Sequence, residues 1–145
     1  MTEDMITETG IRGTVETGLT TEYAWNTGKA VADWLPTAGS IIVLYVSTGQ
    51  QTARAIIEGL RLQGRSVVDG GIGDKYAATA HIKTSGLSGA VVVGVEESTG
   101  VVLIQIFNEG GDVVGRESGL LELAELTDAG NFVPAAVKGE LTAIA

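Results

Sequence analysis

The chain has 145 residues, of which 44% are hydrophobic, and a formal net charge of −9 at pH 7. This charge argues against nucleic acid or an anionic membrane surface as a partner, and no apolar run approaches the ~20 residues that a membrane-spanning helix needs. Because the sequence lacks cysteine and its acidic start lacks the features of a signal peptide, disulfides and thiolate sites are excluded and a cytoplasmic protein is expected.

The first half of the chain predicts short strands alternating with helices. Helices are expected where apolar residues recur at helical spacing, and strands where apolar residues run continuously. Thr20 or Thr21 can cap the first helix, and Gly64 is expected to end the second. The expected elements are a strand or turn at 11–15, a helix at 23–35, a strand at 41–46 buried on both faces, and a helix at 51–62.

The second half continues the same alternation. Its expected elements are a strand at 66–69, a loop at 70–73, a helix at 76–82, strands at 90–93 and 101–107, a turn at 108–112 and a helix at 120–126. This order predicts an α/β layer fold with a mostly parallel sheet. We expect one domain, residues 1–130, followed by a weakly patterned C-terminal tail, residues 131–145.

Two features suggest chemistry but are better explained by structure. The glycines of residues 70–73 could hold an anion with their backbone amides, but Asp74 at the start of the next helix is itself an anion that would occupy this position. A turn is therefore the preferred interpretation. His81 is the only histidine in the sequence, and a single histidine defines no catalytic triad.

Three further positions carry open alternatives. Glu96 and Glu97 could bind a divalent cation or act as an acid/base pair, although adjacent carboxylates on a turn are usually solvated. Trp25 lies off the apolar stripe of the first helix, so it is a candidate for a partner surface. Arg12 is a lone cation between glycines, which suits either a structural salt bridge or a ligand contact.

The sequence Thr-Gly-Ile-Arg-Gly at residues 9–13 resembles the Ser/Thr-Gly-Ile-Arg-Gly signature near the start of the α-D-phosphohexomutases, the phosphoglucomutase/phosphomannomutase group. Later segments resemble the same family in the same order: 19–24, 55–64, 69–72, 104–108 and 120–132. The match covers the N-terminal domain I of that family. The resemblance implies a three-layer α/β/α fold with a mixed, mostly parallel sheet.

In this family, the stretch that corresponds to residues 93–98 reads Thr-Ala-Ser-His-Asn-Pro, and its serine carries the transferable phosphate. Counting back without a gap from the matching strand end places that serine at Val95, and the following His and Asn at Glu96 and Glu97. Valine cannot be phosphorylated, and two carboxylates would repel a phosphosugar. Ser98 has the hydroxyl nearest to Val95 in the sequence. For this degenerate loop, which begins at Gly94, we therefore expect neither catalysis nor phosphosugar binding.

The other functional loops of the family also differ. Its Gly-Arg-Asp-x-Arg loop corresponds to residues 44–49, which contain neither arginine nor aspartate. Its magnesium loop lies in a later domain, so we expect no cofactor and no metal here, with Glu96 and Glu97 as the only metal candidates. Of the active-site residues of domain I, Arg12 alone is retained. Arg12, Thr9 and Ser98 are the ligand-binding candidates.

These departures favour a non-catalytic, stand-alone domain I that works as a binding or self-assembly module. Because domain I buries its flanks against neighbouring domains in the family, we expect a homo-oligomer or a larger protein partner. The candidates for the partner surface are Trp25, Tyr45 and Val101. A second hypothesis is a domain-I subunit of a split phosphoglucomutase or phosphomannomutase, in which Arg12 and Ser98 matter. A third is a sensor of a neutral sugar or a divalent cation.

Overall fold

The computed structural model describes residues 2–36 and 39–144; residues 1 and 145, the ends of the expected domain and tail, lie outside the described part, as do residues 37–38. The strands are β1 (Ile11–Gly13), β2 (Ile41–Tyr45), β3 (Val67–Ile72), β4 (Gly89–Glu96), β5 (Val101–Phe107) and β6 (Leu141–Ala143). The α-helices are α1 (Thr21–Trp34), α2 (Gln50–Leu62), α3 (Lys75–Ser85) and α4 (Leu121–Ala129).

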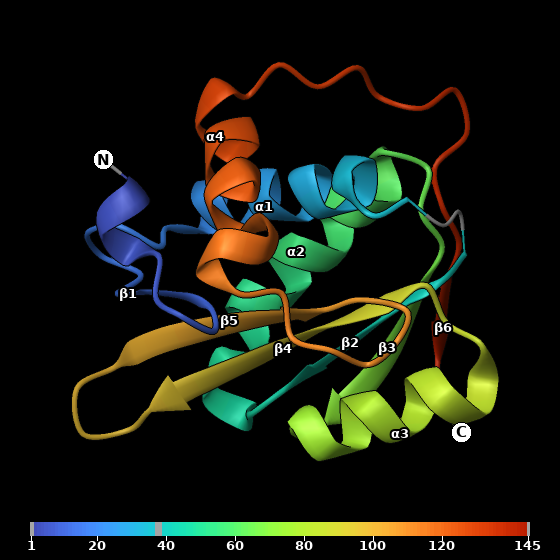
Figure 1. Ribbon diagram of the computed structural model, residues 1–145, viewed down its shortest axis with the longest axis horizontal. Helices are drawn as coiled ribbons and strands as arrows, with labels where there is room; N and C mark the ends of the chain where they lie inside the picture. Colours follow the sequence, from blue (N-terminus) through green and yellow to red (C-terminus); the bar gives the residue numbers. More distant parts are fainter. Residues whose placement is uncertain (1, 37–38, 145) are drawn as a thin grey trace.

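The strands form one six-stranded sheet in the order β1-β5-β4-β2-β3-β6. The pairings β4–β2, β2–β3 and β3–β6 are parallel, and β1–β5 and β5–β4 are antiparallel. Helices α1, α2 and α4 cover one face of the sheet, and α3 covers the other (Figure 1). The structure confirms the predicted three-layer α/β/α fold with a mixed, mostly parallel sheet.

Strand β2 lies at the centre of both cores, as its continuous apolar run predicts. All five of its residues are buried. Ile41, Val43 and Tyr45 pack in the larger core under α1, α2 and α4, whereas Ile42 and Leu44 pack in the smaller core with Ala78 and Ile82 of α3. The alternation follows from the period of two residues in a strand.

Helices α1 and α2 pack closely because each presents a glycine to the other. A Cβ atom at Gly28 would lie 2.3 Å from the Ile56 carbonyl oxygen, and one at Gly59 would lie 2.1 Å from the Trp25 carbonyl oxygen. The two backbones therefore meet without side chains between them.

The predicted cap of α1 is confirmed, since the Thr20 hydroxyl accepts a hydrogen bond from the Tyr23 amide.

The expectation of a loop at residues 70–73 was wrong. Strand β3 continues through Ile72 where a glycine loop was predicted, and an irregularity between Val43 and Leu44 lets β2 pair with Gly71. Gly71 adopts a φ of +71°, which a residue with a side chain rarely adopts. Glycine-rich sequence thus extends the strand here, because the neighbouring strand supplies hydrogen bonds that the local pattern does not indicate.

The C-terminal segment was expected to be a tail and contains strand β6. It leaves α4, crosses the helical layer and returns beside β3, with Val67 opposite Leu141 (Figure 1). The three residues of β6 are exposed, so no apolar pattern marks them as a strand. Within the described residues, none of the helices combines the length and the apolar character needed to cross a lipid bilayer.

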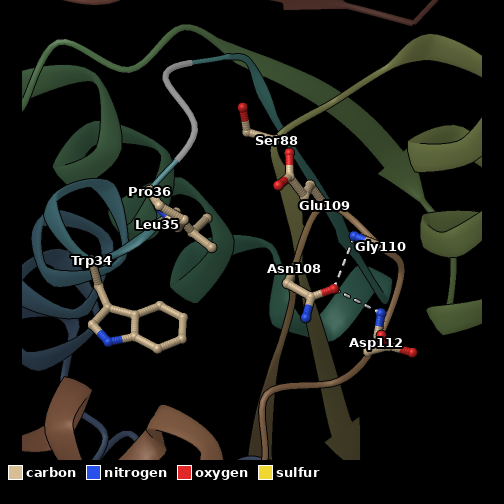
Figure 2. Close-up of a pocket in the computed structure, with 8 residues that line it drawn as sticks. All are labelled: Trp34, Leu35, Pro36, Ser88, Asn108, Glu109, Gly110 and Asp112. Carbon is tan, nitrogen blue, oxygen red and sulfur yellow. Dashed lines mark hydrogen bonds between the residues drawn. The ribbon is translucent and has the colours of Figure 1, made fainter.

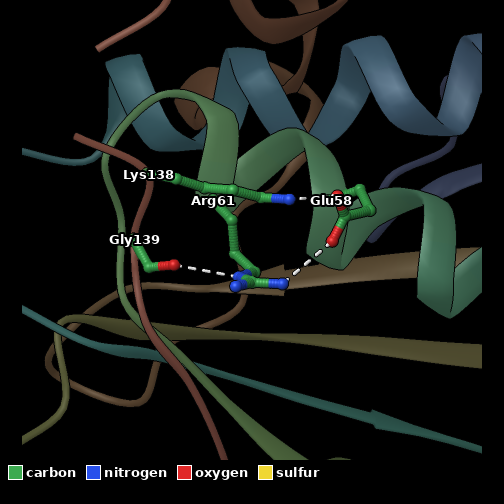
Figure 3. Close-up of polar contacts among 4 residues, drawn as sticks. All are labelled: Glu58, Arg61, Lys138 and Gly139. Carbon is green, nitrogen blue, oxygen red and sulfur yellow. Dashed lines mark hydrogen bonds and ion pairs between the residues drawn. The ribbon is translucent and has the colours of Figure 1, made fainter. Parts of the chain in front are cut away.

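Polar contacts fasten this segment to α2 (Figure 3). The Lys138 ammonium lies 2.7 Å from a carboxylate oxygen of Glu58, whose other oxygen accepts a 3.1 Å hydrogen bond from Arg61. Arg61 also donates from Nε to the Gly139 carbonyl at 2.9 Å, and the Gly139 amide donates back to the Arg61 carbonyl at 2.8 Å. Side-chain and backbone contacts therefore hold the C-terminal segment against α2 just before β6 begins.

Candidate functional site

The residues that correspond to the family's phosphoserine loop form a tight hairpin. Strand β4 runs through Glu96, and β5 begins at Val101. Val95 pairs with Val102, and Glu96 pairs with Val101, within a continuous antiparallel ladder. Val95 is partly buried against the larger core. The position expected to correspond to the phosphoserine is thus an apolar residue within a strand.

Arg12 lies beside this hairpin, and its charge faces a carboxylate. Strand β1 pairs Arg12 with Leu103, and the Arg12 Nη2 atom lies 3.8 Å from Glu96 Oε2. Both side chains are about half exposed, at 52% and 53%. The second Glu96 oxygen accepts a 2.7 Å hydrogen bond from the Thr99 hydroxyl. Both carboxylate oxygens of Glu96 are therefore engaged by residues of this chain.

A cavity of about 210 Å³ lies at this pair, lined by Arg12, Gly94, Val95, Glu96, Val101 and Leu103. Of the residues singled out in the sequence, it brings together Arg12, Val101 and the first three residues of the degenerate loop, Gly94, Val95 and Glu96. Thr9 and Ser98 are not part of its lining: Ser98 is exposed in the hairpin turn, and the Thr9 amide donates to the Thr7 hydroxyl. Among the described residues, no group of three or more acidic, histidine or cysteine side chains could hold a metal ion.

The three residues predicted for a partner surface lie in different settings. Val101 lines the small cavity, and Trp25 is partly buried, with the Lys29 ammonium 3.3 Å from its ring centroid. Tyr45 is only 7% exposed, so its prediction as a surface residue is wrong: the side chain lies in the core. Its hydroxyl donates to Asp69 at 3.0 Å. Burial is the larger cause that raises the pKa of Tyr45, and this hydrogen bond raises it further.

Other apolar side chains, which the sequence did not single out, are exposed. Ile72 and Tyr76 lie at the end of β3 and the start of α3, and Leu141 and Ile144 lie on or beside the edge strand β6. Their exposure depends on the position of the strand end and of the sheet edge. Because both are set by tertiary structure, local periodicity gives no signal for them.

A second cavity, of about 470 Å³, lies at the other end of β4 and β5. Trp34, Leu35 and Pro36, at the end of α1, stand on one side, and Asn108 and the turn after β5 stand on the other (Figure 2). Ser88, just before β4, completes the lining with Glu109, Gly110 and Asp112. These three segments are far apart in the sequence, so no motif could have predicted the cavity.

The comparisons with known proteins point to one family. A family model described as phosphoglucomutase/phosphomannomutase, alpha/beta/alpha domain I, matches residues 4–118. A phosphoglucomutase/phosphomannomutase family protein from Burkholderia thailandensis has a similar structure, with a TM-score of 0.78 at 17% identity over 99% of this chain and 33% of that one. A putative phosphomannomutase from Thermus thermophilus has a TM-score of 0.64 at 15% identity over 94% and 32% of the two chains.

A third similar structure is the open form of parafusin, an exocytosis-sensitive phosphoprotein and phosphoglucomutase from Paramecium. Its TM-score is 0.60 at 16% identity, over 90% of this chain and 25% of that one. At these identities the structures establish a shared fold. The chain spans a third or less of the length of these three proteins. No curated protein sequence matches the chain.

Proposed function

Because the chain belongs to the phosphoglucomutase/phosphomannomutase family, as an α/β/α domain I, we propose that this domain carries no phosphoryl group and acts as a binding or self-assembly module. The proposal rests on the β4–β5 hairpin. A phosphoryl carrier needs a nucleophilic oxygen with cations around it, because phosphoryl transfer depends on positioning and on charge neutralisation. The hairpin instead presents Val95 in a strand ladder, followed by Glu96 and Glu97.

The pairing of Arg12 supports the same conclusion. In the family resemblance, Arg12 is the retained cation of the domain-I site. Here its guanidinium faces the Glu96 carboxylate at 3.8 Å. A phosphate dianion approaching Arg12 would meet Glu96 and the neighbouring Glu97, which oppose it electrostatically. The local charge therefore favours a site without bound phosphosugar.

The assembly role is supported by exposed apolar surface at the sheet edge. Among the described residues, strand β6 pairs with β3 on one side and with no strand on the other, so it ends the sheet. Leu141 and Ile144 are 44% and 42% exposed on this segment. An edge strand with unpaired backbone groups and apolar side chains is a template for pairing with another chain. We therefore place the assembly surface at β6.

Phosphoryl transfer is tested by incubating the protein with a hexose bisphosphate and measuring its intact mass. We expect no phosphate adduct, because Val95 has no oxygen to accept one. The matched test is Ser98→Ala, which removes the hydroxyl nearest in sequence to Val95 that a shifted register could use. A covalent phosphate on the unaltered protein that Ser98→Ala abolishes would overturn the non-catalytic proposal.

Assembly is tested by light scattering over a range of protein concentrations. We expect an oligomer that Leu141→Lys weakens, since a lysine on an edge strand opposes edge-to-edge pairing. Val133→Lys is the matched control, because Val133 is also an exposed apolar residue of the C-terminal segment but lies outside β6. A concentration-independent monomer would contradict self-assembly.

A domain-I subunit of a split mutase is the second candidate, because Arg12 remains half exposed in its cavity. This candidate predicts that the protein restores activity to a chain carrying the remaining domains, and that Arg12→Gln abolishes the restoration. Failure to restore activity in the presence of a bound partner would favour the non-catalytic module.

A further inference from the structure

We propose that the cavity between Trp34 and Asn108 is a binding site for an organic ammonium group. The proposal is independent of the proposed function, because this cavity and the Arg12–Glu96 pair lie at opposite ends of β4 and β5. Its volume of about 470 Å³ falls in the range of small-molecule sites. Its two sides differ in chemistry: one is aromatic and apolar, and the other is polar and acidic (Figure 2).

The Trp34 ring is fixed in place by contacts that leave it beside the cavity. Its indole N–H donates to the Glu122 carboxylate at 2.5 Å. Gly119 lies against the ring, where a Cβ atom would be 2.3 Å from Trp34 Cζ2. Because Gly119 has a φ of +151°, glycine is favoured there for its backbone as well as for its size. The ring is therefore a preorganised wall.

The opposite wall is a turn held by hydrogen bonds, beside a buried hydroxyl that can accept one. Asn108 Oδ1 accepts hydrogen bonds from the amides of Gly110 and Asp112, each at 3.0 Å. Ser88, 2% exposed and part of the same lining, has a hydroxyl with no partner among the described residues. A buried hydroxyl without a partner is uncommon in folded proteins, and its oxygen can accept a hydrogen bond from an ammonium group.

The charge of the lining selects a cation. Glu109 and Asp112 contribute carboxylates, and none of the described residues of the lining is a lysine, arginine or histidine. An ammonium group gains from a carboxylate partner and from the face of an indole ring. The net charge of −9 raises the local concentration of cations further. The same carboxylates would repel an anion. A neutral compound of the same shape would gain neither the ion pair nor the cation–π contact.

The test is a titration with benzylamine followed by ¹H–¹⁵N NMR. We expect saturable shifts at the Trp34 indole N–H, the Asn108 side-chain amide and the Gly110 amide, with a dissociation constant of about 1–10 mM. Benzyl alcohol, the neutral isostere, is expected to bind at least about threefold more weakly, since it lacks the cation–π and charge terms. Equal binding of the two compounds, or no saturation with benzylamine, would overturn the proposal.

Two variants locate the site. Glu109→Gln is expected to weaken benzylamine binding about threefold, as loss of one exposed charge partner should. Glu97→Gln makes the same change in the hairpin at the other end of the strands and is expected to leave the affinity unchanged. If both variants weaken binding equally, the amine is responding to net charge and not to this cavity.

The ammonium group could belong to a free amine or to a lysine side chain. A parallel titration with Nα-acetyl-lysine amide separates the two sources. Binding of benzylamine alone indicates a free amine, since its ring can also use Leu35 and Pro36. Comparable binding of the lysine derivative assigns the site to a lysine of a partner. Both outcomes require the same shifts at Trp34 and Asn108, so their absence with both compounds rejects the site.

Discussion

Helix α2 is held on two sides by contacts of opposite character. Toward α1, Gly28 and Gly59 let the two backbones touch without intervening side chains. Toward the C-terminal segment, Glu58 and Arg61 hold Lys138 and Gly139 through polar groups, and the Glu58 and Lys138 side chains are nearly half exposed. Close-packed interiors tolerate little change in volume, whereas exposed ion pairs contribute little to stability. The first contact should determine global stability, and the second should determine local order.

The largest effect is expected for Gly59→Ala. The new methyl group would lie 2.1 Å from the Trp25 carbonyl oxygen, which is a backbone atom and cannot rotate away. Helices α1 and α2 must separate, and we expect a loss of about 3 kcal/mol in the free energy of unfolding, measured with urea. A midpoint equal to that of the unaltered protein would show that the interface adapts.

Gly94→Ala is the matched control for this prediction. Among the described residues, the atom nearest to a Cβ atom at Gly94 would be the Leu103 carbonyl oxygen, at 4.0 Å. The residue lies in β4 and is not among the glycines with positive φ. We expect a change within about 0.5 kcal/mol. A loss as large as that of Gly59→Ala would mean that any added methyl group is harmful here.

Arg65 is expected to have an effect between those of the glycine interface and of the exposed Lys138–Glu58 pair, because it makes polar contacts but is more buried than that pair. Its guanidinium donates to the carbonyls of Ala32, Leu35 and Gly39, at and beyond the end of α1. Burial lowers the pKa of Arg65, opposed by the charge of Asp33. Arg65→Met keeps the length of the side chain but leaves these carbonyls without the donor, so we expect a loss of about 2 kcal/mol.

Thermal and urea unfolding of Arg65→Met and Lys138→Met should be compared directly. Lys138 makes an exposed ion pair, so its loss should cost less than about 1 kcal/mol. Equal losses for the two variants would mean that burial does not separate strong from weak polar contacts in this protein.

The same contrast explains which elements the sequence could predict. Helix α1 and strand β2 carry their own signals, a Thr20 cap and a continuous apolar run, and both were confirmed. Strand β6 carries no such signal, because its residues are exposed and its backbone, within the part of the chain that the structure describes, pairs with β3 alone. Elements formed by local pattern can be predicted, and elements formed by docking onto a finished sheet cannot.

The candidate sites follow the same division. Counting along the resemblance placed Val95 and Glu96 in the phosphoserine loop. The structure shows instead that β4 extends through Glu96, and it adds the ion pair between Glu96 and Arg12. The cavity at Trp34 joins the end of a helix to Ser88 and to the turn at Asn108. Its parts meet only after the sheet has assembled, so no spacing in the sequence indicates it.

The smallest effect on stability is expected for Glu58→Gln, and it should be local. The hydrogen bond from Lys138 lowers the pKa of Glu58 from its ordinary value of 4.5, against the opposing effect of burial. A carboxylate whose pKa is lowered by folding stabilises the protein above that ordinary value, and the contribution disappears as the pH falls through the lower folded value. Glu58→Gln should remove this dependence and cost less than about 1 kcal/mol, because solvent screens the pair.

Hydrogen exchange distinguishes this local effect from global unfolding. The Gly139 amide, bonded to the Arg61 carbonyl, and the Val67 amide, bonded to the Glu140 carbonyl, should exchange about threefold faster in Glu58→Gln near pH 7. Amides of α1 should be unaffected, and Glu125→Gln, at an exposed position of α4, should change neither set. Faster exchange in α1 as well would mean that the C-terminal contact supports the whole fold. The two sides of α2 would then be coupled, because loosening one would open the other.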